Sequence, residues 1–98
     1  MDRVVLLRSK KVQVSIGELS QDIQRAFYFL VREIEEGGAV RGDWPNYGKL
    51  GKKVHHCHLR KGKPTYVAIW KEEKKGGKII IYFEYVGTHE GAKYQLYK

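Results

Sequence analysis

The spacing of apolar residues along the chain predicts a short strand followed by a helix. Residues 3–7 form an apolar run of the length of a strand. In the segment 10–19 the apolar positions Val12, Ile16 and Leu19 step by four and three residues, which is the period of a helix face. Alternate β-branched residues in the same segment would also suit a strand. The helical spacing favours a helix over residues 9–18.

A second helix is predicted over residues 20–36. Ser20 suits the N-cap position, Asp22 lies in the first turn, and the Gly-Gly pair at 37–38 ends the helix. The apolar stripe of this helix consists of Ile23, Phe27, Leu30, Val31 and Ile34. Such a stripe predicts that the helix packs one face against a sheet.

A long loop rich in glycine is predicted over residues 38–51, with Trp44 and Tyr47 folded back over the core. Three strands are then predicted over residues 54–60, 65–72 and 78–88, joined by turns at 61–64 and 73–77. A Gly-Gly pair in the second turn supplies positive φ angles. The last strand is apolar throughout residues 79–83, which is typical of a central strand buried on both faces.

These elements predict one α+β domain over residues 1–98, with a two-helix hairpin on one face of a twisted, mainly antiparallel four-stranded sheet. The other sheet face is left open. A chain of 98 residues with 42% hydrophobic residues can fill one core between two layers. The residues expected to be largely buried are Ile23, Phe27, Leu30, Ile34, Cys57, Leu59 and Ile81.

The composition predicts a cytoplasmic protein without a membrane partner. The mean hydropathy is −0.54, and the longest apolar runs fall far short of the roughly 20 residues that a membrane-spanning helix needs. The first eight residues lack the long apolar region and the cleavage site of a secretion signal. The single cysteine excludes an internal disulfide, as expected in a reducing compartment.

The net charge of +8 and the sequence pI near 9.6 are typical of proteins that bind polyanions. Seven basic residues and one acidic residue lie between Arg41 and Lys63. This concentration favours a nucleic-acid surface, although a solvated basic face remains the alternative. The candidate RNA-binding residues are Lys49, Lys52, Lys53, Arg60 and Lys63.

The tetrapeptide His55-His56-Cys57-His58 is the most unusual segment of the sequence. On a strand, alternate side chains point to opposite faces, so His55 and Cys57 are expected to face the helices. His56, His58 and Arg60 are then expected on the open face, where an anion would relieve their mutual repulsion. A zinc site of two histidines completed by His89 is an alternative, and so is a solvated histidine-rich face.

A second group of polar residues follows the last strand directly, and it includes His89 and Tyr94. Imidazole titrates near pH 6.5 and suits proton transfer at neutral pH. Tyr94 is suited to stacking on a base or sharing a proton. The sequence contains no Ser-His-Asp arrangement, phosphate-binding glycine loop or dinucleotide fingerprint.

Four stretches of the chain resemble the RelE-like toxins of the RelE/ParE superfamily, and most closely the subgroup described as cytotoxic translational repressors. The stretches are Trp44-Pro45-Asn46-Tyr47 with Lys49-Leu50-Gly51, His56-Cys57-His58-Leu59, Pro64-Thr65-Tyr66-Val67 with Trp70, and Tyr85-Val86-Gly87-Thr88-His89-Glu90 through Tyr94. The resemblance is strongest over residues 44–94. Over residues 3–36 it extends to the order strand, helix, helix.

The resemblance implies a toxin of a toxin–antitoxin module, an endoribonuclease that cleaves mRNA in the ribosomal A site without a metal or other cofactor. Its implied partners are mRNA, the ribosome and a cognate antitoxin protein. The implied catalytic residues are His56, His58, His89 and Tyr94. This chain departs from the family on its third strand, where an apolar residue, Val67, replaces an arginine of many relatives.

The sequence is also compatible with two other functions. One is a toxin of the same fold that inhibits DNA gyrase without enzymatic activity, because a fold does not fix a function. The other is a nucleic-acid-binding module without toxicity. The gyrase inhibitor would not require the histidines, whereas RNA cleavage by 2′-hydroxyl attack requires an acid and a base.

Overall fold

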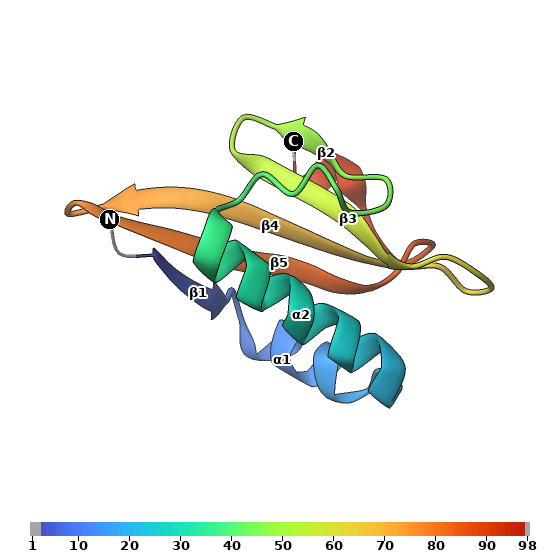
Figure 1. Cartoon of the computed structure of the whole chain (residues 1–98). Coiled ribbons are helices and arrows are strands. Elements are labelled where there is room, and N and C mark those ends of the chain that lie inside the picture. The colour runs from blue at the N-terminus through green and yellow to red at the C-terminus, as the bar shows by residue number, and fades with distance from the viewer. Residues whose placement is uncertain (1–2, 98) are drawn as a thin grey trace.

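Two helices lie on one face of a five-stranded sheet in the computed structural model, which describes residues 3–97 (Figure 1). In chain order the elements are β1 (Arg3–Leu7), α1 (Lys10–Gly17), α2 (Gln21–Gly37), β2 (Gly48–Gly51), β3 (Val54–Arg60), β4 (Tyr66–Lys75), β5 (Lys78–Thr88) and the short 3₁₀ helix η1 (Tyr94–Leu96). The α+β class and the helical hairpin predicted over residues 9–18 and 20–36 are confirmed.

The sheet has the strand order β1-β5-β4-β3-β2 and is mixed. β1 runs parallel to β5, with Arg3 opposite Ile79 and Leu7 opposite Phe83. The other three strand pairs are antiparallel. The prediction of four strands is therefore wrong, because β2 adds a fifth strand at the edge of the sheet.

β2 lies inside the segment that was predicted to be a loop, and its composition explains the error. Gly48-Lys49-Leu50-Gly51 has two glycines and no β-branched residue, so nothing in its pattern indicates a strand. The strand forms on the edge of β3, where Gly48 pairs with His56 and Lys49 with His55.

The turn between β4 and β5 is shorter than predicted. β4 continues to Lys75, which pairs with Lys78, so the predicted connection over residues 73–77 shrinks to Gly76 and Gly77. Both glycines have positive φ angles, of 56° and 80°, as predicted. Left-handed conformations at both central residues match the twist of the two flanking strands.

Serines begin both helices, and an arginine contacts the end of α2. The Ser9 hydroxyl accepts a hydrogen bond from the Val12 N–H at 3.4 Å, and Ser20 occupies the N-cap position of α2 as predicted. Glutamates near the C-terminus of α2 oppose the helix dipole. Arg3 Nη1 offsets this cost by donating to the Glu35 carbonyl at 2.8 Å, which ties β1 to α2.

The core lies between the helices and the sheet. All seven residues predicted to be buried are at most 8% exposed. Phe27 of α2 packs edge-on against Phe83 of β5, with ring centroids 4.9 Å apart. Trp70 of β4 is fully buried, and its Nε1 donates to the Ala39 carbonyl at 3.0 Å.

His55 belongs to this core, as its position in the strand predicts. It is 2% exposed and stacks on Trp70 with centroids 5.8 Å apart. The Tyr47 hydroxyl lies 2.7 Å from His55 Nδ1, and Trp44 Nε1 donates to Glu33 at 2.7 Å. Both aromatic residues of the 38–51 segment therefore fold back over the core as predicted.

β5 is interior, between β1 and β4, but it is buried on only one face. Ile81 and Phe83 face the helices and are buried, whereas Ile80 and Tyr82 are half-buried on the other face. The helices cover one side of the sheet only. On the other side Arg8 lies 3.8 Å above the Tyr82 ring.

Within residues 3–97, neither helix has the length and apolar character needed to cross a membrane.

Trp70→Phe is expected to lower the free energy of unfolding by about 2–4 kcal/mol. The substitution leaves the buried Ala39 carbonyl without its donor and opens space in the core. Tyr28→Phe, at a side chain that is 58% exposed, is the matched control and is expected to stay within about 0.5 kcal/mol of wild type. Urea unfolding followed by circular dichroism measures both, and equal stabilities for the two variants would contradict the prediction.

Candidate functional site

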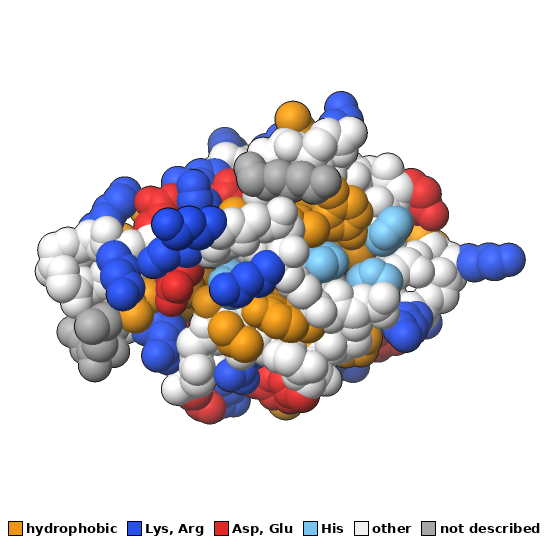
Figure 2. Space-filling view, turned by 90° about the horizontal axis from the view of Figure 1, so that it is seen from above, with side chains coloured by type: hydrophobic (Ala, Val, Ile, Leu, Met, Phe, Trp, Pro, Cys, Tyr) orange, Lys and Arg blue, Asp and Glu red, His pale blue; other side chains and the backbone are white. Residues whose placement is uncertain are grey.

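The sheet face away from the helices carries two of the predicted histidines. His56 and His58 pair with Ile69 and Val67 of β4, so these four side chains share one face. The segment 89–97 after β5, which includes η1, turns back over this face. Figure 2 shows histidine side chains gathered on one side of the molecule beside apolar side chains.

Four aromatic rings meet on this face and are named here the histidine cluster: His56, His58, His89 and Tyr94. The ring centroids lie 5.7 Å apart for His58 and His89, 5.5 Å for His89 and Tyr94, and 5.6 Å for Tyr94 and His56. The structure therefore brings together all four residues that the sequence analysis selected as catalytic.

His56 is anchored to the edge strand β2. Its Nδ1 lies 2.9 Å from the Gly48 carbonyl oxygen, and the ring is half-buried. A Cβ added at Gly48 would lie 3.2 Å from His56 Cε1. The His56 ring thus packs directly against the backbone of β2, at a position where a side chain would crowd it.

His58 is half-buried and has fewer polar contacts than His56. Its Nδ1 is buried and has no hydrogen-bond partner within the described part of the chain. Burial lowers the pKa of His58, and the charges of His89, His56 and Lys61 lower it further. His58 is therefore neutral at neutral pH.

His89 is exposed, but its backbone is held on both sides. The His89 N–H donates to the Thr65 carbonyl at 2.8 Å. The Tyr85 hydroxyl donates to the Thr88 carbonyl at 2.8 Å, and the Gly91 N–H donates to Thr88 Oγ1 at 3.2 Å. This arrangement presents the imidazole from a fixed turn at the end of β5.

Tyr85 is a positioning residue that the sequence analysis missed. Its hydroxyl would lie 2.7 Å from a Cβ placed at either Gly87 or Gly91. The tyrosine can cross this turn only because both positions are glycine. The signal in the sequence was the pair of glycines, four residues apart, on either side of His89.

Tyr94 completes the cluster from the start of η1. Its hydroxyl is buried and makes no hydrogen bond to any residue between 3 and 97. Burial raises the pKa of Tyr94, and Tyr85 adds to the shift. The Tyr94 side chain is therefore a neutral phenol with an unused donor and acceptor beside the imidazoles.

The five predicted RNA-binding cations do not form one patch around the histidine cluster. Arg60 was expected on the open face, and this expectation is wrong. A bulge between His58 and Arg60 changes the alternation, and Arg60 Nη1 lies 4.0 Å from Asp22 at the start of α2. Lys63 lines a hollow beside Arg60 and Ser20.

The other predicted cations are also distributed. Lys49 lies near His55 and lowers the pKa of that residue, although burial lowers it more. Lys53 is in the turn before β3 with a φ angle of 67°. Lys61 was not selected, yet its charge reaches His58.

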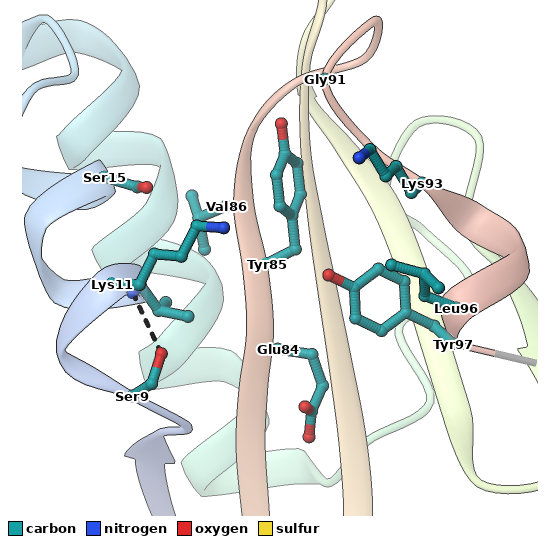
Figure 3. A pocket seen from close by; sticks show the side chains of 11 residues that line it. Ser9, Lys11, Ser15, Glu84, Tyr85, Val86, Gly91, Lys93, Leu96 and Tyr97 are labelled. Atoms are coloured by element: carbon teal, nitrogen blue, oxygen red, sulfur yellow. Dashed lines mark hydrogen bonds between the residues drawn. The ribbon is translucent and has the colours of Figure 1, made fainter.

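Two cavities lie beside the C-terminal segment. One, of about 200 Å³, lies between α1, β5 and η1, and its lining includes Lys11, Tyr85 and Lys93 (Figure 3). The other, of about 300 Å³, includes Lys52 and Tyr97 in its lining. No histidine lines either cavity, so the histidine cluster lies outside both of them.

The histidine cluster does not provide a metal site. Among residues 3–97, no three His, Cys, Asp or Glu side chains are arranged to hold one metal ion together. The alternative of a zinc site at His56, His58 and His89 is therefore not supported by the geometry. Cys57 lies on the helix side and is buried, and burial raises the pKa of its thiol to about 12.

Gly91→Ala is expected to destabilise the protein by about 1 kcal/mol, because the Tyr85 hydroxyl must leave the Thr88 carbonyl to make room. Gly17→Ala is the matched control, since a Cβ there meets no atom within 4 Å. At that helical position alanine is expected to be neutral or to stabilise by up to about 1 kcal/mol. Thermal unfolding separates the two variants. A stabilised Gly91→Ala protein would show that Tyr85 does not constrain the turn.

Acidification from pH 7 to pH 5 is expected to lower the free energy of unfolding. The pKa values of His55 and His58 are both lowered in the folded protein, whereas unfolded histidine titrates near 6.5. Above about pH 6.5 both states are neutral at these residues. Below it the unfolded chain binds protons that the folded state resists, so stability is lost as pH falls through the folded pKa values.

Urea titrations at pH 8, 7, 6 and 5 measure this dependence above the range in which carboxylates protonate. His58→Gln is expected to reduce the loss of unfolding free energy between pH 7 and pH 5. Glu90→Gln, at an exposed position next to His89, is expected to leave this loss unchanged. A stability that is constant or rises from pH 7 to pH 5 would contradict the prediction.

Comparison of the chain with protein-family models, with curated proteins and with solved structures gives no match.

Proposed function

We propose that the protein is an endoribonuclease that cleaves mRNA by attack of the RNA's own 2′-hydroxyl, without a metal ion. The observation that carries the proposal is the convergence of His56, His58, His89 and Tyr94 on one open face. These residues come from β3 and from the segment after β5, more than thirty positions apart in the sequence. The resemblance to RelE-like toxins selects the same four positions.

The reaction needs a base, an acid and positive charge, and this face offers all three. A base removes the proton from the 2′-hydroxyl, and an acid protonates the 5′-oxygen that leaves. Each proton transfer of this kind contributes about 10²- to 10⁴-fold in rate. Imidazoles with different surroundings are suited to divide the two tasks, and Lys61, whose charge reaches His58, supplies charge near the phosphate. The products are a 2′,3′-cyclic phosphate and a 5′-hydroxyl.

The apolar floor of the site sets this chain apart from the toxins that it resembles. Val67 lies between His58 of β3 and Gly87 of β5 and is fully buried. Many RelE-like toxins carry an arginine on this strand. In this protein the positive charge that stabilises the negatively charged transition state would instead come from protonated imidazole and lysine, which makes the proposed activity more sensitive to pH.

We further propose that the enzyme is the toxin of a toxin–antitoxin module, with an antitoxin protein as its partner and ribosome-bound mRNA as its substrate. Its positive charge and open histidine face suit a polyanion in an extended conformation. Induced expression followed by primer extension on cellular mRNA tests this proposal. Cuts in frame with codons are expected. Growth arrest without RNA cuts would instead favour the gyrase-inhibiting toxins of this superfamily, and no arrest would favour a binding module.

His89→Gln is expected to reduce cleavage by roughly 10²-fold or more, which is the range for losing an acid or a base. The fold is expected to survive, because the His89 side chain is exposed. His89→Arg distinguishes proton transfer from charge. Arginine keeps the charge but does not deprotonate in this pH range, so a proton-transferring His89 leaves this variant inactive.

Initial cleavage rates on ribosome-bound mRNA measure these variants, and Glu90→Gln is the matched control at the next exposed position. If both His89 variants cleaved RNA at the wild-type rate, His89 would have no catalytic role.

A further inference from the structure

We propose that the Gly48 carbonyl fixes the tautomer of His56, so that His56 Nε2 is the general base and Gly48 is its positioning residue. The catalytic half of this inference rests on the proposed ribonuclease function. The tautomer itself is a property of the folded chain and is tested without RNA.

The hydrogen bond to β2 determines which ring nitrogen carries the proton. A backbone carbonyl oxygen only accepts hydrogen bonds, so the contact of 2.9 Å requires a hydrogen on His56 Nδ1. In the neutral ring the lone pair then lies on Nε2. A carbonyl that holds one nitrogen of an imidazole in this way fixes the reactive state of the other.

Two features of β2 hold the carbonyl in place. Gly48 is paired with His56 in the ladder, so the strand register sets the position of its backbone. The absence of a side chain at Gly48 lets the ring approach, since an added Cβ would lie 3.2 Å from His56 Cε1. Such a separation is tighter than most Cβ contacts, so a side chain would move the ring or the strand.

His58 is in the opposite situation, although it lies two residues away on the same face. Its Nδ1 is buried and unpartnered among the described residues. An unpaired buried N–H is rarer in proteins than an unpaired acceptor, which favours the lone pair on Nδ1 and the hydrogen on Nε2. Neutral His58 is then a hydrogen-bond donor to the phosphate oxygens, and the role of base falls to His56.

In the proposed step, one proton is taken from the RNA and one is returned to it. His56 Nε2 takes the proton of the 2′-hydroxyl while the 2′-oxygen forms a bond to phosphorus. The bond between phosphorus and the 5′-oxygen breaks, and the leaving oxygen takes a proton from protonated His89. The cluster ends with a proton gained at His56 and one lost at His89, and exchange with water restores both.

Long-range ¹H–¹⁵N correlation spectra of the ¹⁵N-labelled protein at pH 8 test the tautomer. At this pH an ordinary imidazole is neutral. His56 is expected to show a protonated, pyrrole-type Nδ1 and an unprotonated, pyridine-type Nε2, and His58 the reverse. A pyridine-type Nδ1 at His56 would overturn the proposal.

Gly48→Ala and the larger Gly48→Val test the role of β2, with Gly42→Ala as the matched control because a Cβ there meets no atom within 4 Å. The Gly48 variants are expected to show a mixture of His56 tautomers and cleavage reduced by about tenfold to 10²-fold, within the cost of losing a base. The acid limb of the pH–rate profile is expected to move as well. Gly42→Ala is expected to match wild type in both measurements.

The outcomes separate the two halves of the inference. If Gly48→Val mixes the tautomers while its backbone spectrum stays native, yet it cleaves at the wild-type rate with an unchanged pH profile, His56 is not the base. If the wild-type tautomers are as expected but neither free nor ribosome-bound RNA is cut, the proposed function fails and the positioning by Gly48 stands.

Discussion

The two-residue period of β3 is the constraint on which the rest of the molecule depends. One strand supplies Cys57 and Leu59 to the core and His56 and His58 to the opposite face. A shift of one residue in its pairing with β4 would bury the two histidines under the helices and expose the core residues. The same ladder that stabilises the fold therefore places the candidate catalytic groups, and the two cannot be altered independently.

The second determinant of the site is the return of the chain after β5. The segment carrying His89 and Tyr94 comes back over β3 only because the turn at residues 87–91 is tight. Tyr85 spans this turn, and two glycines leave room for it. Rigid backbone on both sides of an exposed imidazole is the arrangement that proton transfer requires, since a small displacement of an acid or base reduces its effect.

Much of this arrangement could be predicted from the sequence, because it depends on local patterns. The helical stripe of α2, the Ser20 cap and the alternation in the histidine tetrapeptide each act within a few residues. The errors lie where tertiary pairing overrides local preference. The sequence of β2 has no strand propensity, and this strand forms because the edge of β3 offers it hydrogen-bond partners. Arg60 does not lie on the open face because a bulge in β3 interrupts the alternation of side chains. The positioning role of Tyr85 and the contact between Gly48 and His56 were missed because both depend on the space that a glycine leaves by having no side chain.

The parallel pairing of β1 with β5 constrains when the sheet can form during synthesis of the chain. Arg8 and Glu84, which bind each other at 2.8 Å, are 76 positions apart, so the first strand has no partner until the last one has been synthesised. Contacts of such long sequence separation form late in folding. The histidine face depends on the same late segment, since His89 and Tyr94 follow β5. A growing chain therefore carries an incomplete site until Tyr94 has been synthesised, and its proposed activity arises only after β5 and the segment that follows it have left the ribosome.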